Sequence, residues 1–164
     1  MNKIEYCCCF TGRRYIDASH LEQLKHNTYE IIKKLSQEGI TDFICGGAMG
    51  FDTLASQLVL DVRNDIPKIR LILALPCKNQ TQGWKKTNID KYDHILSLAD
   101  EVIYVSDEYY EGCMQKRNRF MVDNSSHCVF YMPTPRGGTA YTVKYALEKK
   151  RFIQNALNQM ADQD

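Results

Sequence analysis

Long apolar runs, a secretory leader and an excess of charge of either sign are all missing from this 164-residue chain. No apolar run approaches the length of a membrane-spanning helix and no leader is visible, so we expect a cytoplasmic protein without a membrane partner. The formal net charge is only +1. That balance argues against a surface built to neutralise many nucleic-acid phosphates, although it is compatible with a local basic pocket.

The seven cysteines show neither a disulfide framework nor a Cys-x-x-Cys pair. An odd number without framework spacing is typical of reduced thiols. Cys7, Cys8 and Cys9 are consecutive in an expected strand, so their side chains alternate between faces and cannot together form a tetrahedral metal site. We expect them to be buried as small apolar residues. The four histidines also lack metal-ligand spacing, so the sequence predicts no metal and no cofactor.

What the sequence does contain is a regular alternation of apolar strands and amphipathic helices. Strands are expected at residues 4–10, 42–45, 68–75, 101–105 and 127–132. Helices are expected at residues 19–38, 51–63, 80–98, 114–124 and 139–158. Strands separated by helices imply right-handed crossovers and a mainly parallel sheet. We therefore expect one α/β domain over residues 1–164, a three-layer Rossmann-like fold with a sheet of about five strands.

Two glycine clusters lie about ninety residues apart, and each follows an expected strand and opens an expected helix. The first spans residues 46–50 and is followed by Asp52, and the second spans residues 137–138 and is followed by Thr139. Backbone N–H groups at such a turn, together with the field of the helix amino end, favour a bound anion. Two such loops in one small chain predict a shared pocket for a phosphate-bearing ligand.

Other polar and aromatic residues follow the expected strands. The carboxyl ends of parallel strands share one edge, and ligands bind there at the point where strand order reverses. Residues 11–14 follow the first strand, residues 76–80 and Trp84 follow the third, and Tyr109 and Tyr110 follow the fourth. Phosphate donors, aromatic surfaces and amide or carboxylate groups at one edge suit a nucleotide.

Several of these residues have a second interpretation that the sequence leaves open. Arg13 and Arg14 either grip a phosphate or are solvated arginines in a turn. Asp52 either accepts hydrogen bonds from ribose hydroxyls or complements the helix dipole, an effect of roughly 0.3–1 kcal/mol. Trp84 either stacks on a base or packs against the protein.

Five ordered motifs resemble the small single-domain members of the SLOG superfamily, which joins the DNA-processing Smf proteins to the Lonely Guy enzymes. The motifs are residues 8–14, 46–52, 73–77, 117–119 and 137–141. The resemblance implies a nucleotide-ligand-binding domain that forms homo-oligomers, with Asp52 near the ribose. The candidate ligand-binding residues are Thr11, Gly12, Arg13, Arg14, Gly46, Gly47, Met49, Gly50, Asp52, Pro76, Arg117, Asn118, Gly137, Gly138, Thr139 and Tyr141.

The second glycine cluster separates two functional interpretations. The Lonely Guy enzymes release a free base from a nucleoside monophosphate, and their motif ends in a glutamate after Gly-Thr. Here Thr139 is followed by Ala140 and Tyr141, and the next carboxylate is Glu148. Without a group to stabilise charge on the ribose, a binder is favoured and no catalytic residue is assigned.

Such a binder would sense or sequester a ligand related to NAD, ADP-ribose or a cyclic nucleotide signal, for instance in conflict between phage and bacterium. The alternative is a nucleotide N-glycoside hydrolase, a phosphoribohydrolase in which Asp52 replaces the glutamate. A third hypothesis, a single-stranded DNA binder like the Smf proteins, is disfavoured by the low net charge.

Overall fold

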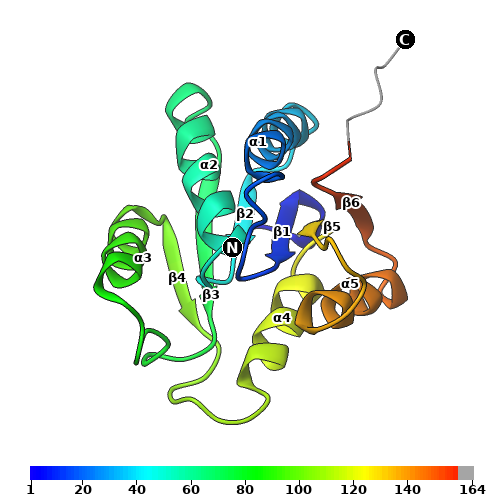
Figure 1. Cartoon of the computed structure of the whole chain (residues 1–164). Helices are drawn as coiled ribbons and strands as arrows, with labels where there is room; N and C mark the ends of the chain where they lie inside the picture. Colours follow the sequence, from blue (N-terminus) through cyan, green and yellow to red (C-terminus); the bar gives the residue numbers. More distant parts are fainter. Residues whose placement is uncertain (159–164) are drawn as a thin grey trace.

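The computed structural model describes residues 1–158, which fold around a six-stranded, wholly parallel sheet (Figure 1). The strand order is β4-β3-β2-β1-β5-β6. The strands are β1 (Cys7–Gly12), β2 (Asp42–Cys45), β3 (Arg70–Leu75), β4 (Glu101–Tyr104), β5 (His127–Tyr131) and β6 (Phe152–Asn155). The predicted Rossmann-like α/β fold is confirmed.

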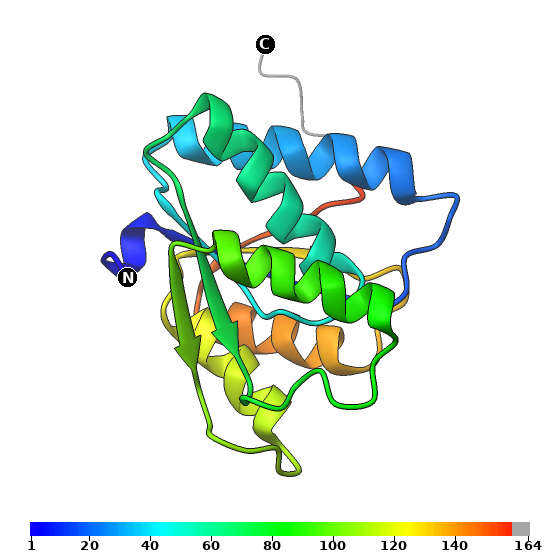
Figure 2. The same ribbon diagram turned by 90° about the vertical axis from the view of Figure 1, so that its left-hand side faces the viewer.

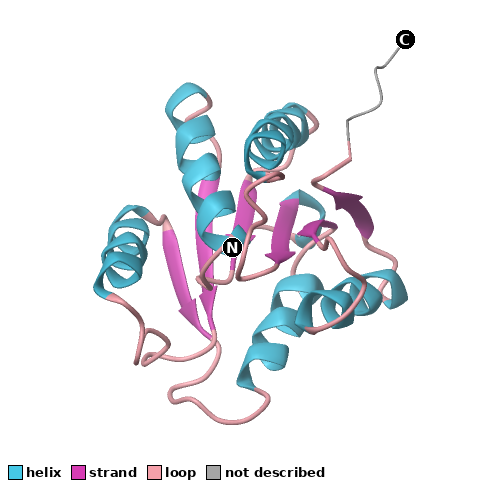
Figure 3. Cartoon of the chain, viewed as in Figure 1, coloured by secondary structure: helices cyan, strands magenta, loops and turns pink. Residues whose placement is uncertain are grey.

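Five helices cover the two faces of the sheet (Figure 3). One face carries α1 (Leu21–Gln37), α2 (Phe51–Asp65) and α3 (Lys86–Leu98), and the other carries α4 (Cys113–Asp123) and α5 (Gly138–Glu148). Because successive side chains of a strand point to opposite faces, β1 contributes to two cores. Cys8 and Phe10 belong to the larger core under α1 and α2, whereas Cys7 and Cys9 belong to the smaller one.

The sequence prediction is wrong at the carboxyl end of the chain. The helix expected at residues 139–158 ends at Glu148, and Lys150 adopts a positive φ of 60° that turns the chain back. The amide of Arg151 then donates to the carbonyl of Ala146 at 2.9 Å. Strand β6 follows and pairs only with β5, so the sheet has one strand more than expected. This strand was missed because it is short, half polar and at the edge of the sheet.

Two other element boundaries differ from the prediction by three residues or more. The expected strand at residues 4–10 begins at Cys7, after a single turn of 3-10 helix at Ile4–Tyr6. The expected helix at residues 80–98 begins at Lys86, because turns occupy the preceding segment and Gly83 has a φ of 83°. Positive φ and a run of small polar residues favour turns over helix.

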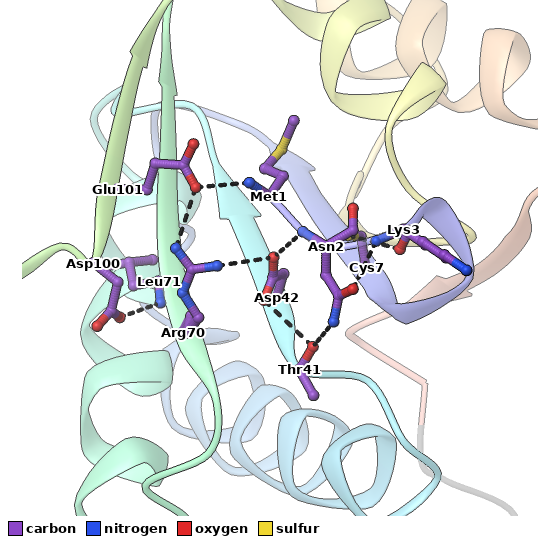
Figure 4. Close-up of polar contacts among 10 residues, drawn as sticks. All are labelled: Met1, Asn2, Lys3, Cys7, Thr41, Asp42, Arg70, Leu71, Asp100 and Glu101. Carbon is purple, nitrogen blue, oxygen red and sulfur yellow. Dashed lines mark hydrogen bonds and ion pairs between the residues drawn. The ribbon is translucent and has the colours of Figure 1, made fainter.

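A polar network closes the amino edge of the sheet (Figure 4). Arg70 donates to Glu101 at 3.2 Å and to the buried Asp42 at 3.5 Å. The amide of Asn2 also donates to Asp42, at 2.7 Å, and the amine of Met1 donates to Glu101 at 2.9 Å. These contacts tie together the first residues of β2, β3 and β4. The amino edge at these three strands is therefore occupied by the chain itself.

Candidate nucleotide-binding site

A cavity of about 1040 Å³ opens where the strand order reverses. From β1 the chain steps outward through β2, β3 and β4, and α4 then carries it back to β5 on the other side of β1. The carboxyl ends of β1 and β5 line the cavity with Thr11, Gly12 and Tyr131. This switch point is where ligands bind in open α/β sheets.

The cavity gathers most of the polar side chains that were expected there. The predicted residues that line it are Thr11, Gly12, Arg13, Arg14, Asp52, Arg117, Asn118, Gly138 and Thr139. The structure does not bring the remaining ones to its lining, namely Gly46, Gly47, Met49, Gly50, Pro76, Gly137 and Tyr141. The side-chain hydroxyl of Tyr141 instead accepts a hydrogen bond from Arg119 at 3.0 Å.

The first glycine cluster packs against the chain itself. A Cβ on Gly50 would lie 2.2 Å from the carbonyl oxygen of Arg14, and one on Gly46 would lie 2.5 Å from the Arg117 guanidinium. A Cβ on Gly47 would lie 2.5 Å from the side chain of Leu75. These glycines allow close approach of neighbouring segments. The three glycines therefore do not line the cavity, but they let the segments next to it pack closely.

The second glycine cluster has free space around Gly138. A Cβ added to Gly138 would meet no atom within 4 Å, and α5 begins without a side-chain cap. Arg13 reaches this helix end from the other side of the cavity, where its guanidinium donates to the hydroxyl of Thr134. One guanidinium nitrogen lies 3.4 Å from the Cβ position of Gly137. A cation beside the positive end of a helix dipole is unfavourable unless an anion lies between them.

Asp52 and Arg117 are two buried ionisable groups that both lie next to the Cβ position of Gly46. Their exposed fractions are 5% and 4%. Burial raises the pKa of Asp52 to about 6, although the Arg117 charge and a hydrogen bond from the Ala48 amide oppose that rise. Arg117 in turn donates to the carbonyl oxygen of Gly46. The Arg117 guanidinium therefore holds together the protein segments next to the cavity.

Asn118 lines the cavity next to Arg117 in the sequence. Its Oδ1 accepts from Nε of Arg117 at 2.8 Å. Since arginine only donates, this contact fixes the orientation of the Asn118 side chain. The NH₂ group of Asn118 is then the donor left for the cavity.

Ten of the residues that line the cavity were not among the sequence candidates, namely Tyr15, Ile16, Asp17, Ala48, Tyr109, Met114, Tyr131, Pro133, Thr134 and Arg136. Arg136 directly precedes the second glycine cluster, and that position was the available signal. Tyr131 gave no such signal, because it lies within an apolar run that predicts only a buried strand. Its hydroxyl accepts from the Asp17 amide at 3.2 Å and pairs with the His20 ring at 3.0 Å. Tyr131 therefore anchors the β1–α1 loop that carries Arg13 and Arg14.

Replacing Tyr131 with phenylalanine tests this anchor. We expect Tyr131→Phe to lower the free energy of unfolding by about 1–2 kcal/mol, because two partly buried hydrogen bonds are lost. Tyr145→Phe is the matched control, since its hydroxyl donates to Asp123 at an exposed site and its loss costs less. Urea denaturation of both variants measures the difference, and equal losses would contradict the anchoring role.

Trp84 packs against the protein and is not placed to stack on a base in the cavity. Its ring meets the Tyr92 ring edge-on, with centroids 5.6 Å apart, and it is not part of the cavity lining. Within residues 1–158, no helix has both the length and the apolar character needed to cross a membrane. In the same part of the chain, no group of three His, Cys, Asp or Glu side chains is placed to hold a metal ion.

Comparison with known families places the chain. Residues 14–163 match the profile of the YspA SLOG family. The chain belongs to this SLOG family. The SPbeta prophage-derived protein YoqJ of Bacillus subtilis is 31% identical over 148 residues, which are 82% of this chain and 85% of YoqJ. A UPF0398 protein of Bacillus thuringiensis is 28% identical over 140 residues, 79% of this chain and 76% of the relative. The SLOG resemblance is confirmed.

Solved structures share the fold of this SLOG protein. DNA processing protein A from Helicobacter pylori, which binds single-stranded DNA, matches with a TM-score of 0.66 and 18% identity over 98% of this chain and 68% of its own. DNA processing protein A from Streptococcus pneumoniae matches with a TM-score of 0.65 and 15% identity, over 96% of this chain and about half, 52%, of its own.

The argument against nucleic acid as a partner was wrong, because a protein with this fold binds single-stranded DNA. It relied on the net charge of the whole chain, which says little about one pocket. The cavity lining carries four arginines against two aspartates. The arginines are Arg13, Arg14, Arg117 and Arg136, and the aspartates are Asp17 and Asp52.

Proposed function

We propose that this SLOG protein binds a nucleotide-derived small molecule in the switch-point cavity, with a phosphate between Arg13 and the amino end of α5. The observation that carries the proposal is that the Arg13 guanidinium lies next to the amino end of α5. That helix end has no side-chain cap, and the space around Gly138 is open. The guanidinium and this helix end are both donors with positive charge, and an anion placed between them relieves their repulsion. Thr139 adds a hydroxyl at the same place.

The size of the cavity supports a ligand larger than a mononucleotide. At about 1040 Å³ it lies at the upper end of ordinary ligand pockets. NAD, ADP-ribose and cyclic nucleotide signals related to them carry the phosphates that the site would hold. A protein that retains such a molecule acts as a sensor or as a sequestering protein.

The placement of carboxylates supports binding over hydrolysis. Glu148 is the last residue of α5, about 15 Å from its amino end at the helical rise. The carboxylates that line the cavity are Asp17 and Asp52. Asp52 is buried, and its Oδ2 already accepts from the Ala48 amide.

Single-stranded nucleic acid is a second candidate ligand. It is favoured by Arg14 and Arg136 at the cavity and by the fold shared with the single-stranded DNA-binding protein of Helicobacter pylori. A basic groove with exposed aromatic side chains is the usual way to hold a single strand. Competition between a short oligonucleotide and ADP-ribose for the protein separates the two ligands.

Removing the Arg13 guanidinium tests the proposed phosphate site. We expect Arg13→Ala to weaken the binding of AMP and ADP-ribose at least about tenfold, because charge-assisted hydrogen bonds to the phosphate are lost. Titration calorimetry provides the dissociation constants. Arg119→Ala removes the same charge outside the cavity lining and serves as the control. Equal effects of the two substitutions would contradict the assignment of the phosphate to Arg13.

A further inference from the structure

Two tyrosines at the cavity are exposed without a structural reason. The side chain of Tyr15 is 88% exposed and that of Tyr109 is 65% exposed, and both line the cavity. Other strongly exposed apolar residues, such as Phe152 at 70%, lie outside the lining. A large aromatic ring that contributes little to the core is a surface for something that binds.

The two rings belong to different loops at the carboxyl edge of the sheet. Tyr15 follows β1 in the loop that Tyr131 anchors. Tyr109 lies in the loop between β4 and α4, which projects beyond the carboxyl end of β4 (Figure 2). That loop is tethered, because the Tyr109 amide donates to Asn79 at 3.2 Å and the Lys78 amide donates to the carbonyl of Asp107 at 3.2 Å. Both tyrosines are thus carried on backbone that other elements hold in place.

Their placement relative to the phosphate site fits one ligand. Tyr15 is two residues from Arg13, at most about 7 Å along the chain. A phosphate at Arg13 and a base at Tyr15 would therefore be held from the same loop and in the same cavity. Asn118 and Thr139 line the same cavity, and their polar side chains suit ribose hydroxyls.

We propose that Tyr15 and Tyr109 hold the nucleobase of the ligand by stacking, while Arg13 and the amino end of α5 hold its phosphate. This inference rests on the proposed nucleotide-binding function and adds how the base is bound. Stacking on an aromatic ring contributes about 1–3 kcal/mol per base and tolerates any base. The site therefore selects nucleotides over sugar phosphates through the tyrosines.

Two probes that share phosphate and sugar test this division. AMP and ribose 5-phosphate are titrated into the wild-type protein and into Tyr15→Ala and Tyr109→Ala. We expect each substitution to weaken AMP binding at least about fivefold and to leave ribose 5-phosphate binding within about twofold. Tyr15→Phe and Tyr109→Phe keep the ring and are expected to restore AMP binding. Tyr110→Ala, beside Tyr109 but outside the lining, is the control.

The outcomes distinguish the inference from the function on which it rests. If the wild-type protein binds both probes equally, or if the alanine variants weaken both equally, the stacking role is overturned and the phosphate site stands. If only the hydroxyl matters, the phenylalanine variants fail and stacking is again overturned. If the wild-type protein binds neither these probes nor ADP-ribose, the proposed function itself falls and the inference falls with it.

Discussion

Gly50→Ala is expected to lower the free energy of unfolding by about 3 kcal/mol or more. Gly50 has φ 80° and ψ −122°, a conformation that side chains rarely adopt. The new Cβ would also lie 2.2 Å from the carbonyl oxygen of Arg14 and 2.5 Å from that of Arg13. These are backbone atoms held in place, since the Phe51 amide donates to the Arg13 carbonyl at 3.0 Å.

Gly39→Ala is the control that separates backbone strain from close contact. Gly39 also has a positive φ, 105°, but its Cβ would meet no atom within 4 Å. We expect a loss of about 1–2 kcal/mol there, from the backbone conformation alone. Urea denaturation of both variants measures the difference. If Gly50→Ala costs no more than Gly39→Ala, the close approach of the β1–α1 loop to the amino end of α2 is not what this glycine provides.

Asp52→Asn is expected to change the pH dependence of stability. Burial raises the pKa of Asp52 from 3.8 in the unfolded chain to about 6 in the folded protein. Between these values the folded state carries a proton that the unfolded state has lost, so wild-type stability falls as pH rises through this range. Asparagine does not titrate. The stability of the variant minus that of the wild type should therefore rise by about 2.4 kcal/mol between pH 4 and pH 8.

The difference between the two proteins isolates this one group. Arg117 stays charged across the whole range, so losing its buried partner shifts the difference by a constant amount. Other titrating groups are common to both proteins and cancel. Denaturation at a series of pH values measures the curve. A difference that is flat, or that falls with pH, would contradict the raised pKa of the buried Asp52.

The central part of the fold was predictable because its pattern is local. The strand at residues 42–45 is a buried apolar run that ends in glycines, and it is β2 as observed. Consecutive burial of Cys7, Cys8 and Cys9 follows from a strand that is covered on both faces. Strand β6 was not predictable in this way, since Gln154 and Asn155 give it no apolar alternation and its pairing to β5 is a tertiary contact.

The site was predictable only in outline. Rules for parallel sheets place Arg13, Asp52 and Asn118 at one edge, and the cavity there contains them. A sequence shows a glycine but not what a Cβ at that position would meet, so the packing role of Gly46 and the openness of Gly138 required coordinates. The anchoring role of Tyr131 was hidden for the same reason, because it depends on contacts made by one hydroxyl.

Identification of the compound that the protein retains tests the account most directly. The pure protein is incubated with AMP, ADP-ribose, NAD and cyclic ADP-ribose isomers, then washed and denatured by heat, and the released small molecules are identified by mass spectrometry. We predict recovery of one intact phosphate-bearing nucleotide from the wild-type protein, and its loss from Arg13→Ala but not from Arg119→Ala. A free base with a ribose phosphate would show hydrolysis instead. Recovery of no compound from the wild-type protein would contradict the proposed nucleotide site.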